Sequence, residues 1–197
     1  MQKLFDPGCT PAQYQLLGKD FPFPDLTNTK CFLCEKACLA RHGFYTRNLV
    51  ERGFDGLILV RRYICCDCGH TVSLLPFFVH PGRTYGTGVI IDVLNEFYLE
   101  EHGAVTACTA YYVKSTVDCS RQLLLWFRKR IEENAEALVF LLKEVLQVKA
   151  PPLEKPGIKG VVRQFLEIIH GLQPTMVSLV LHNTTGQSYL TKNHAIA

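Results

Sequence analysis

Apolar residues at helical spacing fill the second half of the chain. Helices are predicted over Thr87–Glu101 and Val105–Val113, and, after a polar turn at residues 114–116, over a long segment from about Asp118 to Val148. The stripe that this long helix would bury consists of Leu124, Phe127, Ile131, Ala135, Leu138, Leu141, Leu142 and Val145. This half of the chain is therefore expected to be mostly helical.

Short β-rich runs occupy the part of the chain around residues 31–75. Strands are predicted over Gly43–Arg47, Leu57–Ile64 and Thr71–Leu74, with a glycine-marked turn between the first two. Residues 1–30 carry four prolines among polar residues, which favours an irregular lead-in with one short helix near Pro11–Leu17.

Proline and glycine also mark two breaks further along. Residues 76–86 hold two prolines and two glycines and are predicted to form a hinge. The run Ala150–Gly157 has the composition of a linker, and one more helix is predicted after it, over Val161–His170. From Gln173 onward no clear period is visible.

Composition places the chain among ordinary globular proteins. Of its 197 residues, 48% are apolar and 20% are charged, which excludes general disorder. The apolar runs are too short to span a bilayer, and Met1–Thr10 lacks the apolar stretch of a signal peptide. We therefore expect a cytoplasmic protein without a membrane partner. Disulfides are rare in a reducing compartment, so its nine cysteines are expected to have another role.

Two CxxC pairs indicate what that role is. Cys31 and Cys34 form the first pair, Cys65 and Cys68 the second, and the β-rich stretch 35–64 separates them. Two knuckles that bring four thiolates to one point make a tetrahedral site, which suits Zn²⁺ in a structural role because no coordination position stays open. Gly69, directly after the second pair, favours the tight turn that such a knuckle needs.

Other residues near the pairs leave alternatives open. Cys38 lies about one turn beyond Cys34 and is the most credible substitute ligand, while Cys66, His42 and His70 could also compete. Cytosolic CxxC pairs can also be redox-active, although redox activity is typical of a single pair in a βαβ context. The sequence favours metal.

Positive charge is concentrated in two places, although the net charge is only +3. One place is the β-rich region, and the other surrounds the start of the long helix, where a short helix, a turn and a second helix fit a helix-turn-helix. Side chains of this kind can contact phosphates and base edges of double-stranded DNA. The candidate DNA-binding residues are Arg47, Arg61, Arg62, Lys114, Arg121, Gln122, Arg128 and Lys129.

The pattern resembles the N-terminal region of bacterial transposases and small transposase-like proteins of mobile elements. The resemblance is carried by the two CxxC pairs, by the run from Val60 to Pro76, and by Ser120-Arg121-Gln122 with Trp126. It covers about residues 31–130 and implies a zinc ribbon followed by a helix-turn-helix that binds transposon-end or related DNA. Cys66 departs from the proline or charged residue often found inside the second knuckle.

The expected fold class is α+β: a small β-rich four-cysteine zinc ribbon followed by a mostly α-helical region with the helix-turn-helix. The expected division is a lead-in at residues 1–30, the zinc ribbon at 31–80, the helical domain at 87–148, and a linker and tail at 149–197. The tail's role and the DNA target sequence are not given by the sequence.

The expected function is zinc-dependent DNA binding by an accessory or regulatory protein. A catalytic core is not expected, because the 66 residues after Ile131 hold no aspartate and no long strand–helix alternation for a two-metal nuclease site. The alternatives are a zinc-stabilised interaction adaptor whose long helix pairs with a partner or a second copy, and an enzyme of the redox or nuclease type.

Overall fold

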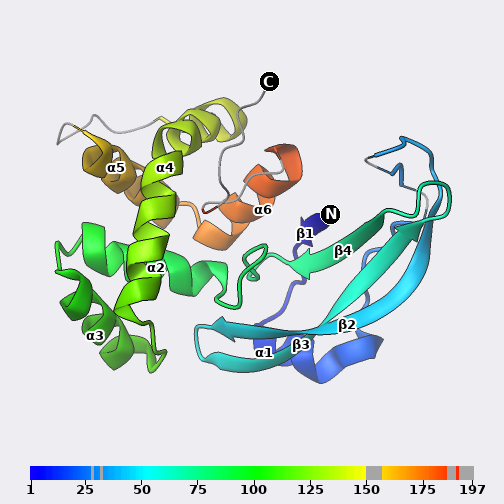
Figure 1. Cartoon of the computed structure of the whole chain (residues 1–197), viewed down its shortest axis with the longest axis horizontal. Coiled ribbons are helices and arrows are strands. Elements are labelled where there is room, and N and C mark those ends of the chain that lie inside the picture. The colour runs from blue at the N-terminus through cyan, green and yellow to red at the C-terminus, as the bar shows by residue number, and fades with distance from the viewer. Residues whose placement is uncertain (28, 32, 150–156, 186–189, 191–197) are drawn as a thin grey trace.

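The computed structural model describes residues 1–27, 29–31, 33–149, 157–185 and 190 (Figure 1). Its sheet has four strands in the spatial order β1-β4-β3-β2. Strand β1 is parallel to β4, and the other neighbours are antiparallel. The strands are β1 Gln2–Phe5, β2 Leu39–Glu51, β3 Phe54–Cys65 and β4 Thr71–Pro76.

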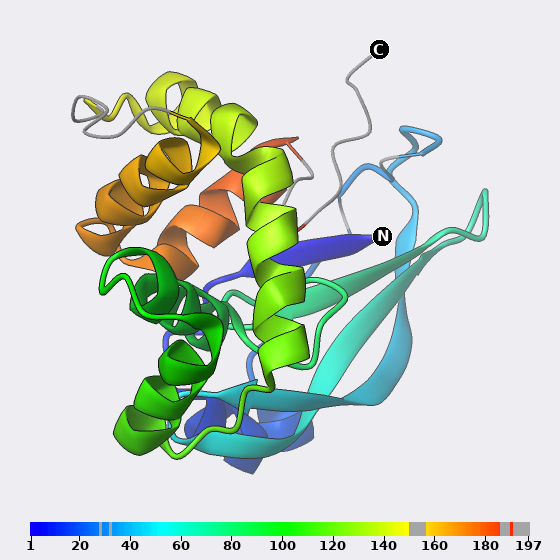
Figure 2. The ribbon, with the colours of Figure 1, turned by 60° about the vertical axis from the view of Figure 1, so that its left-hand side comes forward.

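Five helices follow the sheet and gather beside it, as Figures 1 and 2 show. They are α2 Thr87–Tyr98, α3 Ala104–Ser115, α4 Arg121–Leu146, α5 Ile158–His170 and α6 Pro174–Thr185. The short helices α1 Pro11–Leu17 and η1 Gly18–Asp20 lie against β3 instead. The predicted α+β fold class is confirmed, with the β-rich part first and the helical part after it.

Two clusters of buried apolar residues stabilise the fold. One lies between helices α2 to α6 and includes the predicted stripe of α4 except Val145, with Leu124, Phe127, Ile131 and Leu138 fully buried. The other lies around the sheet and the N-terminal segment. Ser120 caps α4 by accepting a hydrogen bond from the backbone N–H of Leu123. The helical part therefore has a core of its own.

Glu51, at the end of β2, joins the sheet to the helices. Its side chain is buried, and its carboxylate accepts hydrogen bonds from the backbone N–H groups of Arg52 and Gly88. Gly88 lies in the first turn of α2, so the carboxylate acts as a cap for a helix whose N-cap residue, Gly86, has no side chain. A Cβ at Gly86 would lie 2.1 Å from a Glu51 oxygen, which explains the glycine.

The N-terminal segment is more ordered than the sequence predicted. The short helix near Pro11–Leu17 is present, but residues 2–5 form strand β1 rather than an irregular lead-in. A run of four residues is too short to predict a strand from its pattern, and each of these residues pairs with a residue of β4 that lies 71 positions further along the chain. Leu4, Phe5, Tyr14 and Phe21 belong to the buried core of the sheet.

The C-terminal part also differs from the expected linker and tail. The helix predicted at Val161–His170 is present as α5, and α6 follows it without having been predicted. The Asn183 side chain exchanges two hydrogen bonds with the backbone of Leu4, at 3.0 and 2.8 Å, and so satisfies the outer edge of β1. The proline-rich part of the expected linker, residues 150–156, lies outside the described residues.

The expected hinge at residues 76–86 is a packed connection. Phe78, Val79 and His80 are buried, and Arg47 donates a hydrogen bond to the His80 carbonyl oxygen. Prolines and glycines here shape a turn whose side chains enter the core. Among the described residues, no helix has both the length and the apolar character needed to cross a membrane.

His80 makes stability sensitive to acid. Burial, with smaller contributions from Arg83 and Arg47, lowers the pKa of His80 to about 3. Below about pH 6.5 the unfolded chain binds a proton that the folded chain excludes, so stability falls by about 1.4 kcal/mol per pH unit down to about pH 3. We predict that His80→Asn shows a smaller loss between pH 6.5 and 4.5 in denaturant titrations. Equal slopes in the two proteins would contradict this assignment.

Candidate metal centre

The two CxxC pairs form turns of matching geometry at one end of the β2–β3 hairpin. In the first, the N–H of Glu35 donates to the carbonyl of Cys31, and in the second the N–H of Gly69 donates to that of Cys65. Both Glu35 and Gly69 have left-handed backbone, with φ of 60° and 70°. The turn predicted from Gly69 is confirmed, and the first knuckle makes the same turn with a glutamate.

These turns bring the four predicted sulfur atoms together. The Cys31 and Cys68 sulfurs lie 3.7 Å apart, those of Cys34 and Cys65 lie 3.5 Å apart, and all four lie within 4.8 Å of one another. A tetrahedral metal with bonds of about 2.3 Å to sulfur has sulfur–sulfur edges of about 3.8 Å. The four cysteines are therefore close enough to hold a metal ion, and their spacing fits a tetrahedral one.

Backbone groups around the sulfurs favour thiolates. The backbone N–H groups of Cys34 and Leu33 lower the pKa of Cys31. The Cys38 thiol and the backbone N–H of Cys68 lower the pKa of Cys65 to about 6. Desolvation and the neighbouring thiols raise the pKa of Cys34 and raise that of Cys68 to about 12. Because only the deprotonated thiol binds metal, Cys31 and Cys65 are prepared for a cation, whereas Cys34 and Cys68 would lose their protons when the ion binds. An ion pair of 2.6 Å between Lys36 and Asp67 ties the two knuckle loops together.

Cys38 lies beside the cluster, and Cys66 lies outside it. The Cys38 sulfur is 3.0 Å from that of Cys65, closer than a tetrahedral edge, and it is not among the four mutually close ligand atoms. Cys66 is exposed, and its backbone N–H donates to the Cys38 carbonyl. The arrangement favours the predicted four cysteines and leaves Cys38 as a neighbour that hydrogen-bonds to a ligand.

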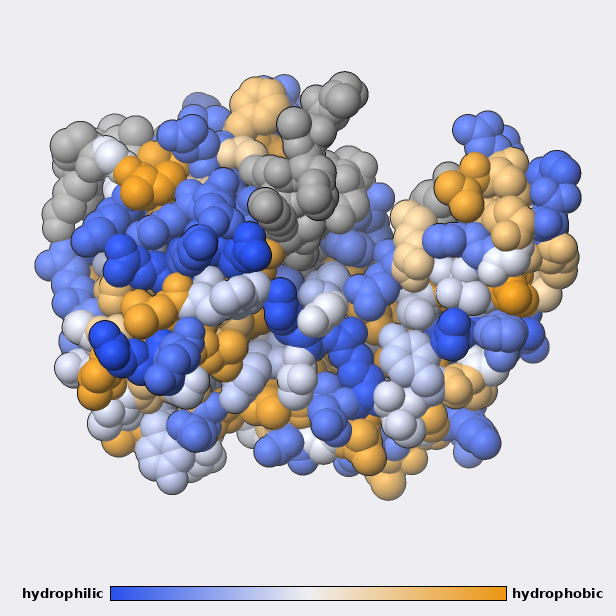
Figure 3. Space-filling view, viewed as in Figure 1, coloured by the Kyte–Doolittle hydropathy of each residue, from blue (hydrophilic) through white to orange (hydrophobic). Residues whose placement is uncertain are grey.

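The cluster lies far from the helices. It occupies the end of the hairpin where β2 begins and β3 ends, and this end projects away from the helical part in Figures 1 and 3. The opposite end of β2 carries Glu51 and contacts α2. With about 3.3 Å per residue, the 13 residues of β2 place roughly 40 Å between the two ends. A metal here would hold the sheet directly and α4 only through the sheet.

Several candidate DNA-binding residues are occupied by contacts within the chain. Arg47 donates to backbone carbonyls of His80 and Arg83, and burial lowers its pKa. Lys114 pairs with Glu96, and Arg128 pairs with Glu132 at 3.0 Å. On the sheet, the guanidinium of Arg62 lies 5.8 Å from the Tyr45 ring and contacts Thr71. These residues have structural roles that the sequence pattern did not reveal.

Three of the predicted residues stand free on α4. The side chains of Arg121, Gln122 and Lys129 are exposed and form no hydrogen bond or ion pair with the part of the chain that the structure describes. Arg121 and Gln122 lie in the first turn, where the helix dipole adds positive potential, and Lys129 lies in the third turn. Trp126, on the same helix, packs against the helical core, with the guanidinium of Arg83 3.9 Å from its ring centre.

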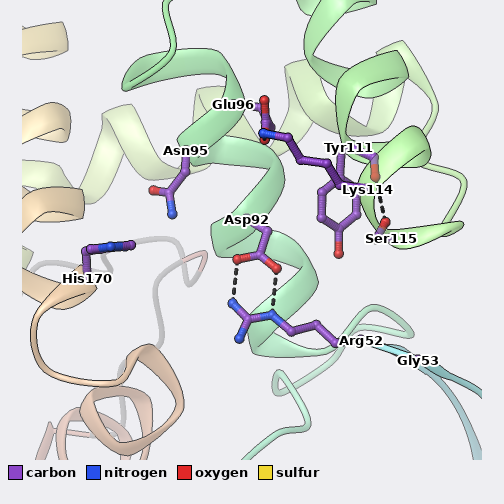
Figure 4. Close-up of a pocket in the computed structure, with 9 residues that line it drawn as sticks. All are labelled: Arg52, Gly53, Asp92, Asn95, Glu96, Tyr111, Lys114, Ser115 and His170. Carbon is purple, nitrogen blue, oxygen red and sulfur yellow. Dashed lines mark hydrogen bonds and ion pairs between the residues drawn. The ribbon is translucent and has the colours of Figure 1, made fainter.

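A cavity of about 570 Å³ opens where the hairpin tip meets α2, α3 and α5 (Figure 4). Its charged lining is internally neutralised, because Arg52 pairs with Asp92 and Lys114 with Glu96. Tyr111 lines the space, as Figure 4 shows, and its hydroxyl is buried without a hydrogen-bond partner among the described residues. This pairing leaves no excess charge that would select an ionic ligand.

The fold and the four-cysteine cluster define an α+β protein with a candidate metal site. A family model described as a domain of unknown function (DUF6431) matches residues 31–113. The match begins at Cys31 and ends within α3, so it includes both cysteine pairs, strands β2 to β4 and α2, and it stops before α4. No curated protein and no solved structure matches the chain.

Cysteine substitutions test the site directly. We predict that the purified chain carries about one divalent metal ion, that Cys65→Ser loses it, and that Cys66→Ser and Cys38→Ser keep it, because only four sulfurs have tetrahedral spacing. Metal content by mass spectrometry, with thermal unfolding before and after chelation, provides the measurement. Loss of metal in Cys38→Ser together with retention in Cys34→Ser would show that the ligand set is different.

Proposed function

We propose that the chain is a zinc-dependent DNA-binding protein, an accessory or regulatory protein of a mobile element that acts without a catalytic core of its own. The observation that carries the proposal is the exposed group at the start of α4. Arg121, Gln122 and Lys129 have no partner among the described residues, whereas most other basic side chains of the helical part are paired with carboxylates.

The connection between α3 and α4 supports a helix-turn-helix. α3 ends at Ser115, Thr116 takes the left-handed conformation with φ 59°, and α4 begins at Arg121 after its Ser120 cap. α4 packs on α2 and α3 through Leu124, Phe127 and Ile131, which leaves the opposite face free. In a recognition helix, side chains near the N-terminus contact base edges and those further along contact phosphates.

Zinc is the metal we assign to the cysteine cluster. Four thiolates are soft ligands, and the observed sulfur spacing suits a tetrahedral ion, a combination typical of structural zinc. Cys31, Cys34, Cys65 and Cys68 would hold the ion and leave no open position. The ion would contribute stability to the sheet, whose core is a separate cluster from that of the helices.

An interaction adaptor without DNA binding is the second candidate. On α3, the side chains of Val105, Tyr112 and Val113 are 63%, 53% and 76% exposed, and Phe140 on α4 is 61% exposed. Exposed apolar residues at helical spacing favour contact with a partner or with a second copy. This candidate requires association through the exposed apolar side chains of α3 and the later part of α4 rather than DNA binding through the start of α4.

Substitutions on α4 separate the two candidates. We predict that Arg121→Ala weakens binding to a DNA duplex by about 1–3 kcal/mol if it reads a base. Lys129→Ala should lower the slope of log K against log salt by about 0.9, the value for one lost phosphate contact. Fluorescence anisotropy at several salt concentrations gives both numbers.

Lys143→Ala provides the control, because Lys143 is an exposed lysine in the last turn of the same helix. It should leave binding unchanged. Absence of duplex binding at low salt, together with a concentration-dependent oligomer in sedimentation, would overturn the proposal in favour of the adaptor.

A further inference from the structure

A small hollow on the face of the sheet that carries α1 gathers positive charge among aromatic rings. Its volume is about 170 Å³, and no carboxylate lines it. Its lining residues are Lys19, Phe21, Phe23, Arg41, Phe44, Arg61 and Tyr63. They come from three segments, namely η1 with the chain after it, β2 and β3, so the hollow exists only when these segments are packed together.

A β-bulge in β2 places the lining residues of the two strands on one face. Arg41 pairs with Tyr63 and Phe44 pairs with Arg61, and the register shifts by one residue between Arg41 and Gly43. Without this extra residue, positions 41 and 44 would point to opposite faces of the strand. Gly43 has φ 114°, a conformation that side chains rarely adopt. The bulge therefore brings a second arginine to the hollow.

Aromatic contacts orient the guanidinium of Arg61. It lies 4.6 Å from the centre of the Phe44 ring and 5.6 Å from that of Tyr63. Tyr63 is fixed in turn, because it is buried and its hydroxyl donates to the Pro24 carbonyl at 2.9 Å. A guanidinium held by its flat face keeps its N–H edge available, which is the geometry that recognises a phosphate.

The charges in the hollow are less neutralised than elsewhere in the protein. Neither Arg61 nor Lys19 forms an ion pair within the described ranges, and Arg41 has one contact of 3.1 Å with Asp25, in which both side chains are more than half exposed. Exposed pairs of this kind are weak. By contrast, the ion pairs of Arg52, Lys114, Arg128, Arg130 and Arg163 each include one side chain that is mostly shielded from solvent.

We propose that this hollow binds one backbone phosphate of the nucleic acid that α4 contacts, through Arg61, Lys19 and Arg41. The inference rests on the proposed function and extends it to a second contact region on the sheet. A phosphate suits the hollow better than a base does, because the volume is below that of ordinary small-molecule pockets and Arg61 already covers the Phe44 ring.

The hollow also explains how a metal far from α4 could influence binding. Tyr63 lies two residues before Cys65, and Cys65 pairs with Leu39, two residues before Arg41. The cysteine cluster thus holds the strand ends that carry the lining residues. The metal supports this second contact region directly and α4 only indirectly.

The test uses the full metal-loaded chain with two probes, inorganic phosphate and a random-sequence duplex. In Arg61→Met the side chain can still pack on Phe44 but loses its charge, Lys19→Met changes an exposed residue, and Lys143→Met is the matched control. We expect inorganic phosphate at constant ionic strength to shift the amide NMR signals of residues 41 and 61, and Arg61→Met and Lys19→Met to reduce these shifts. On the duplex, Arg61→Met should lower the salt slope by about 0.9, whereas Lys143→Met should not.

The outcomes separate this inference from the proposed function. If the duplex binds through α4 but neither the phosphate shifts nor the slope change appear, the hollow is not a contact and the proposed function stands. If phosphate binds in the hollow but the slope is unchanged, the site takes a free anion and the assignment to nucleic acid is overturned. If phosphate binds and no duplex does, the proposed function fails together with that assignment.

Discussion

The convergence of four sulfur atoms at the end of the β2–β3 hairpin is the constraint on which the two cysteine knuckles depend. The chain around the cysteines has little regular structure, and Cys31 is the only residue of the stretch 29–31 and 33–38 that is buried. The free energy gained by burying so few side chains is too small to offset the conformational entropy that this segment loses on folding. Metal coordination can offset that loss, because an ion binds all four sulfurs only when both knuckles are folded and in contact.

The helical part depends on a different kind of interaction. α4 is held by a continuous apolar stripe against α2, α3 and α5, and its core contains none of the four clustered cysteines. Glu51 and the packed connection at residues 76–86 join the two parts. The protein thus combines a sheet region that has its own apolar core and a candidate metal site with a helical region stabilised by apolar burial, and each presents basic side chains to solvent.

Local signals in the sequence predicted much of this structure. The CxxC spacing identified the four clustered cysteines, and the helical stripe identified α4, because both patterns are set by neighbours along the chain. Strand β1 and helix α6 were missed because their places depend on each other: Asn183 satisfies the free edge of β1. A contact between residues 179 positions apart produces no local pattern of apolar and polar residues from which it could be predicted.

Charge was the least predictable feature. The sequence does not show which carboxylate or carbonyl a basic side chain contacts. In the structure, Lys114 pairs with the buried Glu96, Arg128 pairs with Glu132 on its own helix, and Arg47 donates hydrogen bonds to two backbone carbonyls. Four of the eight predicted contact residues, Arg61, Arg121, Gln122 and Lys129, form no hydrogen bond or ion pair with the described part of the chain. Phe21 and Phe23 mark one wall of the hollow in the sequence. The hollow itself could not be predicted from them, because it forms only when the bulge in β2 places Arg41 and Phe44 on the same face.

X-ray absorption spectroscopy at the zinc edge, on protein purified without added metal, tests the central claim most directly. The account predicts a first shell of four sulfur atoms at about 2.3 Å with no nitrogen or oxygen neighbour. A shell that contains histidine nitrogen or water oxygen, or a preparation that folds fully without metal, would contradict it.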